Sequence, residues 1–159
     1  MTGSDTIDDL LELRFDDAPQ NVSGDADTTH LHSIANHQSC RLYTDQAVPH
    51  DLVLQLSALA LSSPTKSDLQ QRDIIIVDDP DKRATINALF PDSTWIAGAP
   101  VFLIFCGNNR RLRQIHERAG HPFENDHLDA FFNAAVDAGI ALSAFALAAD
   151  AAGMATCPI

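Results

Sequence analysis

DAFFNAAVDAGIALSAFALAADAAGMA, residues 129–155, contains the longest helical pattern in the chain. Its large apolar side chains cover more than one helix face, and alanine rather than charge fills the gaps. The large ones are Phe131, Phe132, Val136, Ile140, Leu142, Phe145 and Leu147. A helix that is apolar most of the way round is buried in a core or in a subunit interface. The pattern predicts a helix over residues 125–152, ended by Gly153, and in so small a domain we expect it to form an interface.

The rest of the chain alternates short helical patterns with two β-branched runs. DIIIV (73–77) and VFLIFC (101–106) predict buried strands, and residues 154–159 resemble the opening of a third. Helices are expected over residues 6–15, 28–37, 51–61 and 81–89, with a short helical turn at 95–97.

Length and charge limit the classes of function. The chain has 159 residues, enough for one domain with a substantial core. Its 10 Lys+Arg against 22 Asp+Glu give a net charge of −12, which opposes binding to nucleic acid or anionic lipid. We divide it into an acidic N-terminal helix and arm (1–27) and a domain (28–159). The basic cluster at residues 110–113 predicts a solvated helix start, with an anion or NADPH contact as the alternative.

Cysteine usage and the N-terminus indicate a cytoplasmic protein. Cys40, Cys106 and Cys157 are odd in number and widely spaced, which is typical of reduced thiols. Cys106 lies inside an apolar run, so we expect it to be a buried core thiol. Residues 1–9 are acidic and lack the pattern of a secretory signal. No apolar stretch is expected to be long enough to span a bilayer.

Two segments carry the residues suited to a ligand. HQSCRLYTDQ (37–46) gathers an imidazole, a hydroxyl and a guanidinium at the end of a predicted helix. Such groups bind phosphate through charge and through donors in a fixed geometry. SSPTKSDLQ (62–70) is a small-residue loop between a helix and a strand, where folds of this kind commonly place ligand contacts. Together the segments suggest a phosphorylated cofactor.

In this order the segments resemble the FMN-dependent nitroreductase/flavin reductase family. The resemblance covers about residues 30–159 and rests on HQSCRLYTDQAV (37–48), SSPTKSDLQQ (62–71) before DIIIV, WIAGAPVFLIFC (95–106), the long helix and TCPI (156–159). It implies a nitroreductase-like α+β fold in which helices flank a mixed central sheet. It also implies a homodimer in which the long helix lies at the interface and FMN binds there. NADPH or NADH would reduce the flavin, which would then reduce a nitroaromatic, a quinone or free flavin in a ping-pong cycle. It implies no dedicated catalytic side chain.

The resemblance also assigns cofactor contacts. His37, Ser39 and Arg41 match the phosphate and ribityl contacts, and Gln38 stands where the family usually has arginine. Thr65, Lys66 and Ser67 match the loop along the isoalloxazine ring, with Gln70 and Ser93 as weaker candidates on the same edge. Pro158 and Ile159 match a strand end that enters the flavin pocket. Asp68 replaces a common asparagine, and we expect it to point outward or to cap a turn.

Simpler structural roles compete with these assignments. His37 would instead cap its helix, Thr65 and Ser67 would be turn residues without a ligand, and Arg41 would pair with Asp45 or another carboxylate.

Two histidine pairs, 30 with 32 and 121 with 127, lack Cys or carboxylate partners at metal-ligand spacing, so no zinc site is expected. Asp137, inside the apolar helix, is expected to be a buried, hydrogen-bonded carboxylate and not a base.

The family pattern continues beyond the sequence in hand. After TCPI the resemblance implies a Gly-rich loop with basic side chains, further strands and an extension around the partner subunit. We therefore expect a fold incomplete at its C-terminus and keep two hypotheses. The first is an FMN-dependent NAD(P)H oxidoreductase. The second is a non-catalytic remnant that acts only as a dimerisation or flavin-binding module.

Overall fold

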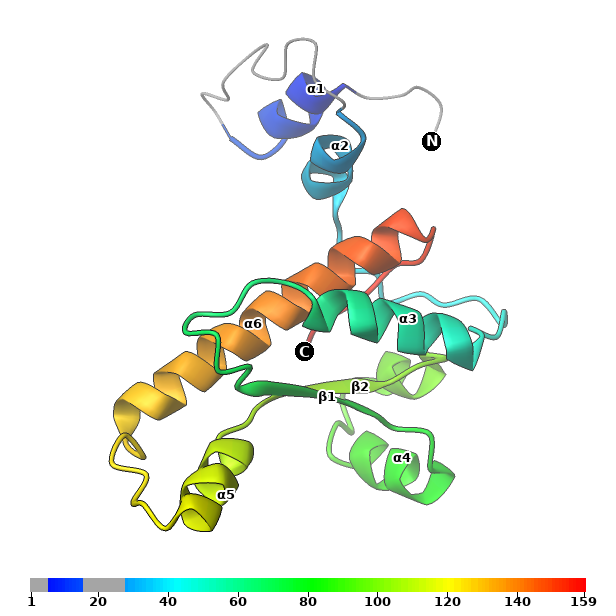
Figure 1. Ribbon diagram of the computed structural model, residues 1–159. Helices are drawn as coiled ribbons and strands as arrows, with labels where there is room; N and C mark the ends of the chain where they lie inside the picture. The colour runs from blue at the N-terminus through cyan, green and yellow to red at the C-terminus, as the bar shows by residue number, and fades with distance from the viewer. Residues whose placement is uncertain (1–5, 16–27) are drawn as a thin grey trace.

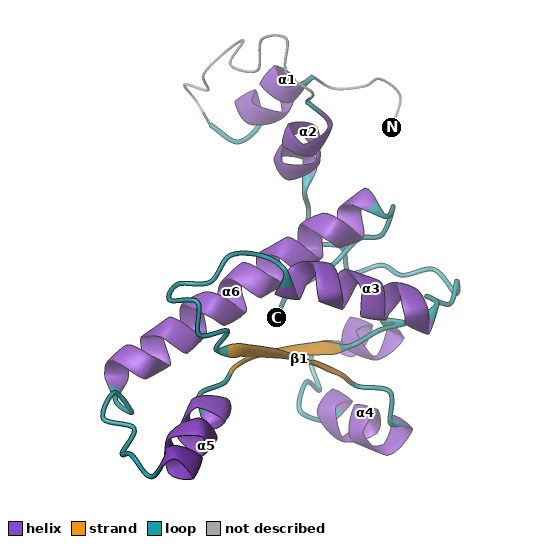
Figure 2. Cartoon of the chain, in the orientation of Figure 1, coloured by secondary structure: helices purple, strands orange, loops and turns teal. Residues whose placement is uncertain are grey.

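The computed structural model describes residues 6–15 and 28–159. Within them a long helix and a shorter one cover one face of a small sheet (Figures 1 and 2). The long helix is α6 (Leu128–Ala151) and the shorter one is α3 (His50–Leu61). The sheet pairs β1 (Arg72–Ile76) with β2 (Leu103–Gly107). The predicted α+β class is confirmed, because helices and this sheet share one core.

Helix α6 ends through a left-handed glycine, as the sequence predicts. Gly153 has φ +75°, a conformation that other residues adopt only at a cost. Its N–H donates to the carbonyl of Asp150 at 2.9 Å, and the N–H of Met154 donates to the carbonyl of Ala149 at 2.9 Å. This pair of bonds is the Schellman arrangement, which satisfies carbonyls that a helix end leaves without partners.

The core lies where α3, α6 and the sheet meet. Leu56 and Ala60 of α3 pack against Phe145 and Ala149 of α6, and all four are buried. Phe105 of β2 meets Phe145 edge to face, with ring centroids 5.6 Å apart. Alanine in the gaps of the long helix allows this approach, because small side chains let a second element come close. The large aromatic ring then fills the space between helix and sheet.

The two strands are antiparallel, and their faces differ. Ile74 pairs with Phe105 toward the helices, whereas Ile75 pairs with Ile104 on the opposite face, where both are exposed. Gly107 ends β2 beside α6. A Cβ placed there would lie 2.9 Å from backbone atoms of Ala134, so the strand end and the helix touch through this glycine.

The remaining elements surround this body. Helices α1 (Ile7–Glu12) and α2 (Thr29–Asn36) contact each other and lie near the C-terminal end of α6 (Figure 1). Helix α4 (Pro80–Asn87) packs on the 3₁₀ helix η1 (Thr94–Gly98), and α5 (Arg110–Ala119) follows β2. The predicted arm at residues 16–27 lies outside the described residues, and the domain division at residue 27 stays a prediction.

Three expectations need correction. In the described part of the chain the sheet is antiparallel rather than mixed, since residues 154–159 form no strand and the sheet has two members. Cys106 is half-buried rather than core, because it pairs with Asp73 on the sheet face away from the helices. Helix α6 also passes, by length and hydropathy, the test for a membrane span, although the core helix of a soluble protein passes it too.

Candidate functional site

The first predicted segment, residues 37–41, lies against the C-terminal end of α6. His37 occupies the C-cap position of α2, so the alternative of a capping role is correct for its backbone. Its side chain goes elsewhere: Nδ1 lies 2.6 Å from Oδ2 of Asp150, and both side chains are less than a third exposed. A carboxylate at Nδ1 holds the proton on that nitrogen and fixes the ring.

Arg41 is exposed and forms no ion pair with Asp45 in the described part of the chain, contrary to the simpler alternative. Its guanidinium lies over the ring of Trp95, 5.5 Å from the centroid. Stacking of this kind holds the plane of the guanidinium while its N–H groups stay available to an anion. Ser39 and Gln38, on the same segment, are exposed as well.

The end of the chain lies beside this segment. The N–H of Cys40 donates to the carbonyl of Thr156 at 3.0 Å, which places residues 156–159 next to residues 37–41. Burial raises the pKa of Tyr43, and the nearby thiols of Cys157 and Cys40 raise it further. Pro158 and Ile159 are exposed at this end. The structure therefore brings together the predicted phosphate contacts and the predicted strand end.

The second predicted segment is the α3–β1 loop, residues 62–71, which lies beside the middle of α6 (Figure 1). Ser67 donates through Oγ to Oε1 of Gln71 at 3.3 Å, as a turn residue does. Thr65 differs, since its Oγ1 is buried without a hydrogen-bond partner in the described structure. Lys66 and Asp68 are exposed, and Asp68 has φ +57°. Asp68 thus points outward, as expected.

Asp137 fixes this loop from within. It is fully buried, and its two carboxylate oxygens accept the backbone N–H groups of Lys66 at 2.7 Å and Gln71 at 3.0 Å. The prediction of a buried, hydrogen-bonded carboxylate is confirmed. Arg72 is buried too and donates to the carbonyls of Leu61, Ser63 and Pro64, at 2.5–2.9 Å.

The two segments are far apart within one chain. The loop is tied to α6 at Asp137, and residues 37–41 are tied to it at Asp150. At a rise of about 1.5 Å per residue, these two positions are about 20 Å apart along the helix axis. Ser93 precedes η1 and is half-buried, with no side-chain capping bond. One chain therefore holds two separate candidate surfaces, not one closed pocket.

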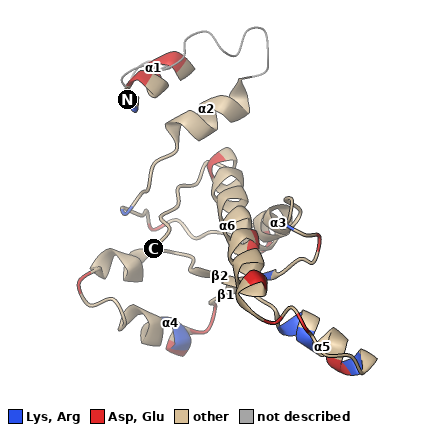
Figure 3. Ribbon diagram, turned by 90° about the vertical axis from the view of Figure 1, so that its left-hand side faces the viewer, with Lys and Arg blue, Asp and Glu red and all other residues tan. Residues whose placement is uncertain are grey.

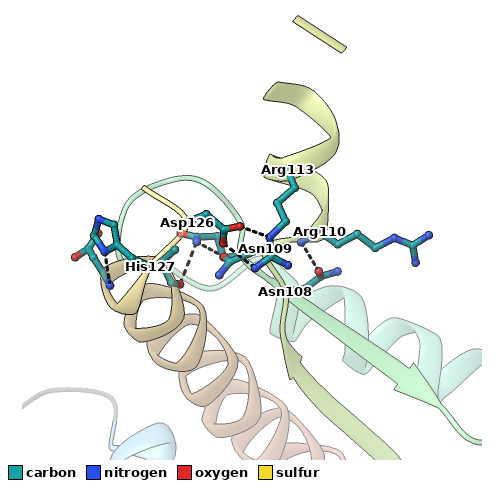
Figure 4. Close-up of polar contacts among 9 residues, drawn as sticks. Asn108, Asn109, Arg110, Arg113, Asp126 and His127 are labelled. Carbon is teal, nitrogen blue, oxygen red and sulfur yellow. Dashed lines mark hydrogen bonds and ion pairs between the residues drawn. The ribbon is translucent and has the colours of Figure 1, made fainter. Parts of the chain in front are cut away.

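The basic cluster at residues 110–113 begins helix α5, as expected. Figure 4 shows that Arg113 forms a two-pronged pair with Asp126, at 2.7 Å for each bond, whereas the side chain of Arg110 points away from the cluster. The hydrogen bond from Arg113 is the main cause that lowers the pKa of Asp126. Arg111 donates to the carbonyl of Gln70, so one member of the cluster reaches the α3–β1 loop.

Sequence reasoning missed three residues. No role was predicted for Asp150, and Arg72 and Arg111 were not assigned to the loop. For Asp150 a signal existed, because a carboxylate in an alanine-rich helix needs a partner. For Arg72 and Arg111 the acceptors are backbone carbonyls, which no sequence pattern marks. Among the described residues no group of three or more His, Cys, Asp and Glu is placed to hold a metal ion.

Comparison with known proteins identifies relatives of this chain. The family model for "Nitroreductase family" matches residues 34–159. An FMN reductase [NAD(P)H] of Bacillus subtilis is 35% identical over 132 residues, covering 81% of this chain and 53% of the relative. The structure of NfrA2 from B. megaterium is 34% identical, with TM-score 0.73, over 78% of this chain and 51% of that one.

A third relative is known in complex with a nicotinamide cofactor. The NADPH:FMN oxidoreductase of Vibrio harveyi, described in complex with NAD⁺, is 25% identical, with TM-score 0.70. The match covers 78% of this chain and 52% of that one. The chain thus spans about half the length of the relatives it matches.

Proposed function

Because this chain belongs to the nitroreductase family, we propose that it is an FMN-dependent NAD(P)H oxidoreductase that acts as a homodimer. The observation that carries the proposal is the pair of donor surfaces held by one helix, at Asp137 and at Asp150. We propose FMN contacts from residues 37–39 and Arg41, from the loop residues Thr65–Ser67 and Gln70, and from Ser93, Pro158 and Ile159.

The residues present fit the chemistry of FMN. Arg41 and Ser39 are exposed donors suited to a phosphate, and His37, held through Nδ1 by Asp150, adds a donor at its other ring nitrogen when protonated. The loop offers the buried hydroxyl of Thr65, whose oxygen has no partner in the described structure. A polar ring edge would supply the bond that this hydroxyl lacks. When bound, FMN supplies the redox chemistry between NADPH or NADH and an electron acceptor.

Two chains are needed for one site in this proposal. The separation of about 20 Å along α6 exceeds the length of the ribityl chain that joins the flavin ring to its phosphate. We therefore propose that one subunit gives residues 37–41 and its partner gives the α3–β1 loop. Exposed apolar side chains support an interface, since Leu128, Phe131 and Phe132 of α6 are 77%, 67% and 58% exposed. Figure 3 shows that α2, α3 and α6 carry few charged residues along most of their length.

The protein's contribution to the reaction is placement and charge. Donors of the loop stabilise negative charge on the reduced ring, and Arg41 anchors the phosphate. No side chain is assigned as a catalytic acid or base. We propose a nitroaromatic, a quinone or free flavin as the acceptor in a ping-pong cycle, and a cytoplasmic location consistent with three free cysteines.

Absorption spectroscopy tests the proposal. The purified chain is incubated with FMN, desalted and mixed with NADPH or NADH without oxygen. We expect retained flavin absorbance that bleaches and then recovers when a quinone is added. A protein that stays colourless refutes the flavoprotein assignment for this chain. Flavin that is retained but never bleached favours the alternative of a flavin-binding module.

Sedimentation tests the dimer separately. The chain is expected to sediment as a dimer, and the double substitution Phe131→Ser with Phe132→Ser is expected to give a monomer, because it removes two exposed rings from α6. Ile75→Ser, on the open face of the sheet, is the matched control and should leave the dimer intact. A wild-type monomer contradicts the proposed site between two subunits.

A further inference from the structure

The backbone of the α3–β1 loop (residues 62–71) is held by three charged side chains, of which Asp137 and Arg72 are buried and Arg111 is exposed. Asp137 accepts N–H groups at both ends of residues 66–71. The guanidinium of Arg72 donates to carbonyls of residues 61, 63 and 64, and that of Arg111 donates to the carbonyls of Leu69 and Gln70. The carboxylate therefore fixes the amides and the two guanidinium groups fix the carbonyls.

Asp137 has no other visible role. It is 0% exposed and forms no ion pair in the described part of the chain. A buried carboxylate is unfavourable unless hydrogen bonds replace its water, and here the two loop amides do so. Each carboxylate oxygen therefore accepts one backbone N–H of the loop.

Between the two amides the loop adopts an uncommon conformation. Asp68 and Gln70 have φ +57° and φ +54°, in the left-handed region that favours glycine. Non-glycine residues persist there only when their surroundings hold them, and such positions concentrate at ligand sites. The two bonds to Asp137 bracket both residues, so this carboxylate stabilises the loop where it is least favourable.

We propose that Asp137 is a positioning residue for the flavin ring: it holds the α3–β1 loop in the conformation that presents Thr65 and the neighbouring loop donors to FMN. The inference rests on the proposed function. Without Asp137 the loop samples other conformations. The apparent affinity for flavin then falls in proportion to the population of the conformation that binds flavin. Stabilisation of the reduced ring by loop donors falls with it.

Hydrogen exchange of the FMN-free wild-type protein tests, without any flavin, whether Asp137 holds the α3–β1 loop. NMR detection resolves single amides, and we expect those of Lys66 and Gln71 to exchange about tenfold or more slowly than the amide of exposed Asp68. Equal exchange at all three positions overturns the proposal. This measurement needs no variant, so it is decisive even where substitutions at residue 137 prevent folding.

Two substitutions extend the test. Asp137→Asn places an amide donor against two N–H donors, whereas Asp137→Ser removes the charge without adding that conflict. We expect exchange at Lys66 and Gln71 to become about tenfold faster in both, as loss of one hydrogen bond allows. Asp81→Asn, on the exposed surface of α4, is the matched control and should change neither amide. Unchanged loop exchange in a folded Asp137 variant contradicts the proposal.

Flavin binding then separates positioning from a purely structural role. In folded Asp137→Ser we expect affinities for FMN and riboflavin to fall by the same factor, about tenfold, because the loop contacts the ring and not the phosphate. The midpoint potential of bound flavin should become more negative. Faster loop exchange with unchanged affinity and potential overturns the positioning role. Absence of FMN binding by the wild-type chain instead refutes the proposed function. The exchange result still decides whether Asp137 holds the loop.

Discussion

Replacement of Gly107 by alanine tests how α6 is seated on the sheet. The added Cβ would lie 2.9 Å from the carbonyl carbon and oxygen of Ala134 and 3.1 Å from its Cβ. The two carbonyl atoms belong to the backbone of buried Ala134, so the strand end or the helix must shift. Overpacking of this kind costs about 1–3 kcal/mol. For a domain of this size, that lowers the melting temperature by about 2–12 °C.

Gly98→Ala is the matched control, because a Cβ there meets only Cδ2 of Tyr43 at 3.9 Å, an ordinary contact. Thermal unfolding followed by circular dichroism compares both variants with the wild type. We expect Gly98→Ala to stay within about 0.5 kcal/mol of the wild type. Equal melting temperatures for Gly107→Ala and the wild type refute the close approach of β2 and α6. Equal losses of melting temperature in both variants show that the loss in Gly107→Ala does not come from contact with Ala134.

Three further predictions concern helix ends, charge and the phosphate side. Gly153→Ala should lower the free energy of unfolding by about 1–2 kcal/mol, since alanine at φ +75° is strained, and a urea titration showing no loss contradicts this. The pKa of Asp126 is lowered by Arg113, so the pair stabilises the fold above the ordinary carboxylate pKa and is lost as pH falls through the lowered one. Melting temperatures of wild type and Asp126→Asn should therefore differ at neutral pH and converge in acid; a constant gap counts against the pair. Asp150→Ala should raise the FMN dissociation constant about tenfold, because His37 loses its 2.6 Å partner, and fluorescence titration measures it.

The sequence predicted what depends on local pattern. Alanine spacing and Gly153 indicated α6 and its end, and the β-branched runs indicated both strands to within two residues at either end. The hydrogen-bonded state of Asp137 followed from the cost of burying a charge. The helix, its end and the strands depend on rules that act over a few residues, whereas the partners of Asp137 do not follow from such a rule.

What the sequence did not predict depends on contacts between distant segments. Asp150 meets His37 across 113 residues, and Asp137 meets Lys66 across 71. The strand predicted at residues 154–159 does not form, although Thr156 accepts a bond from Cys40, because one such bond makes no ladder. Cys106 was placed in the core because an apolar run does not reveal that one face of its strand is open.

The central claim is that each flavin site combines residues 37–41 of one subunit with the α3–β1 loop of the other. Subunit mixing tests it directly, with Arg41→Ala as the first variant and the double substitution Thr65→Val with Ser67→Ala as the second. Each variant alone should bind FMN weakly. In a mixed dimer one site carries both defects and the other carries none, so we predict recovery of one wild-type site per mixed dimer by FMN titration. If both surfaces of a site belong to the same chain, mixing recovers no site, and that result contradicts the account.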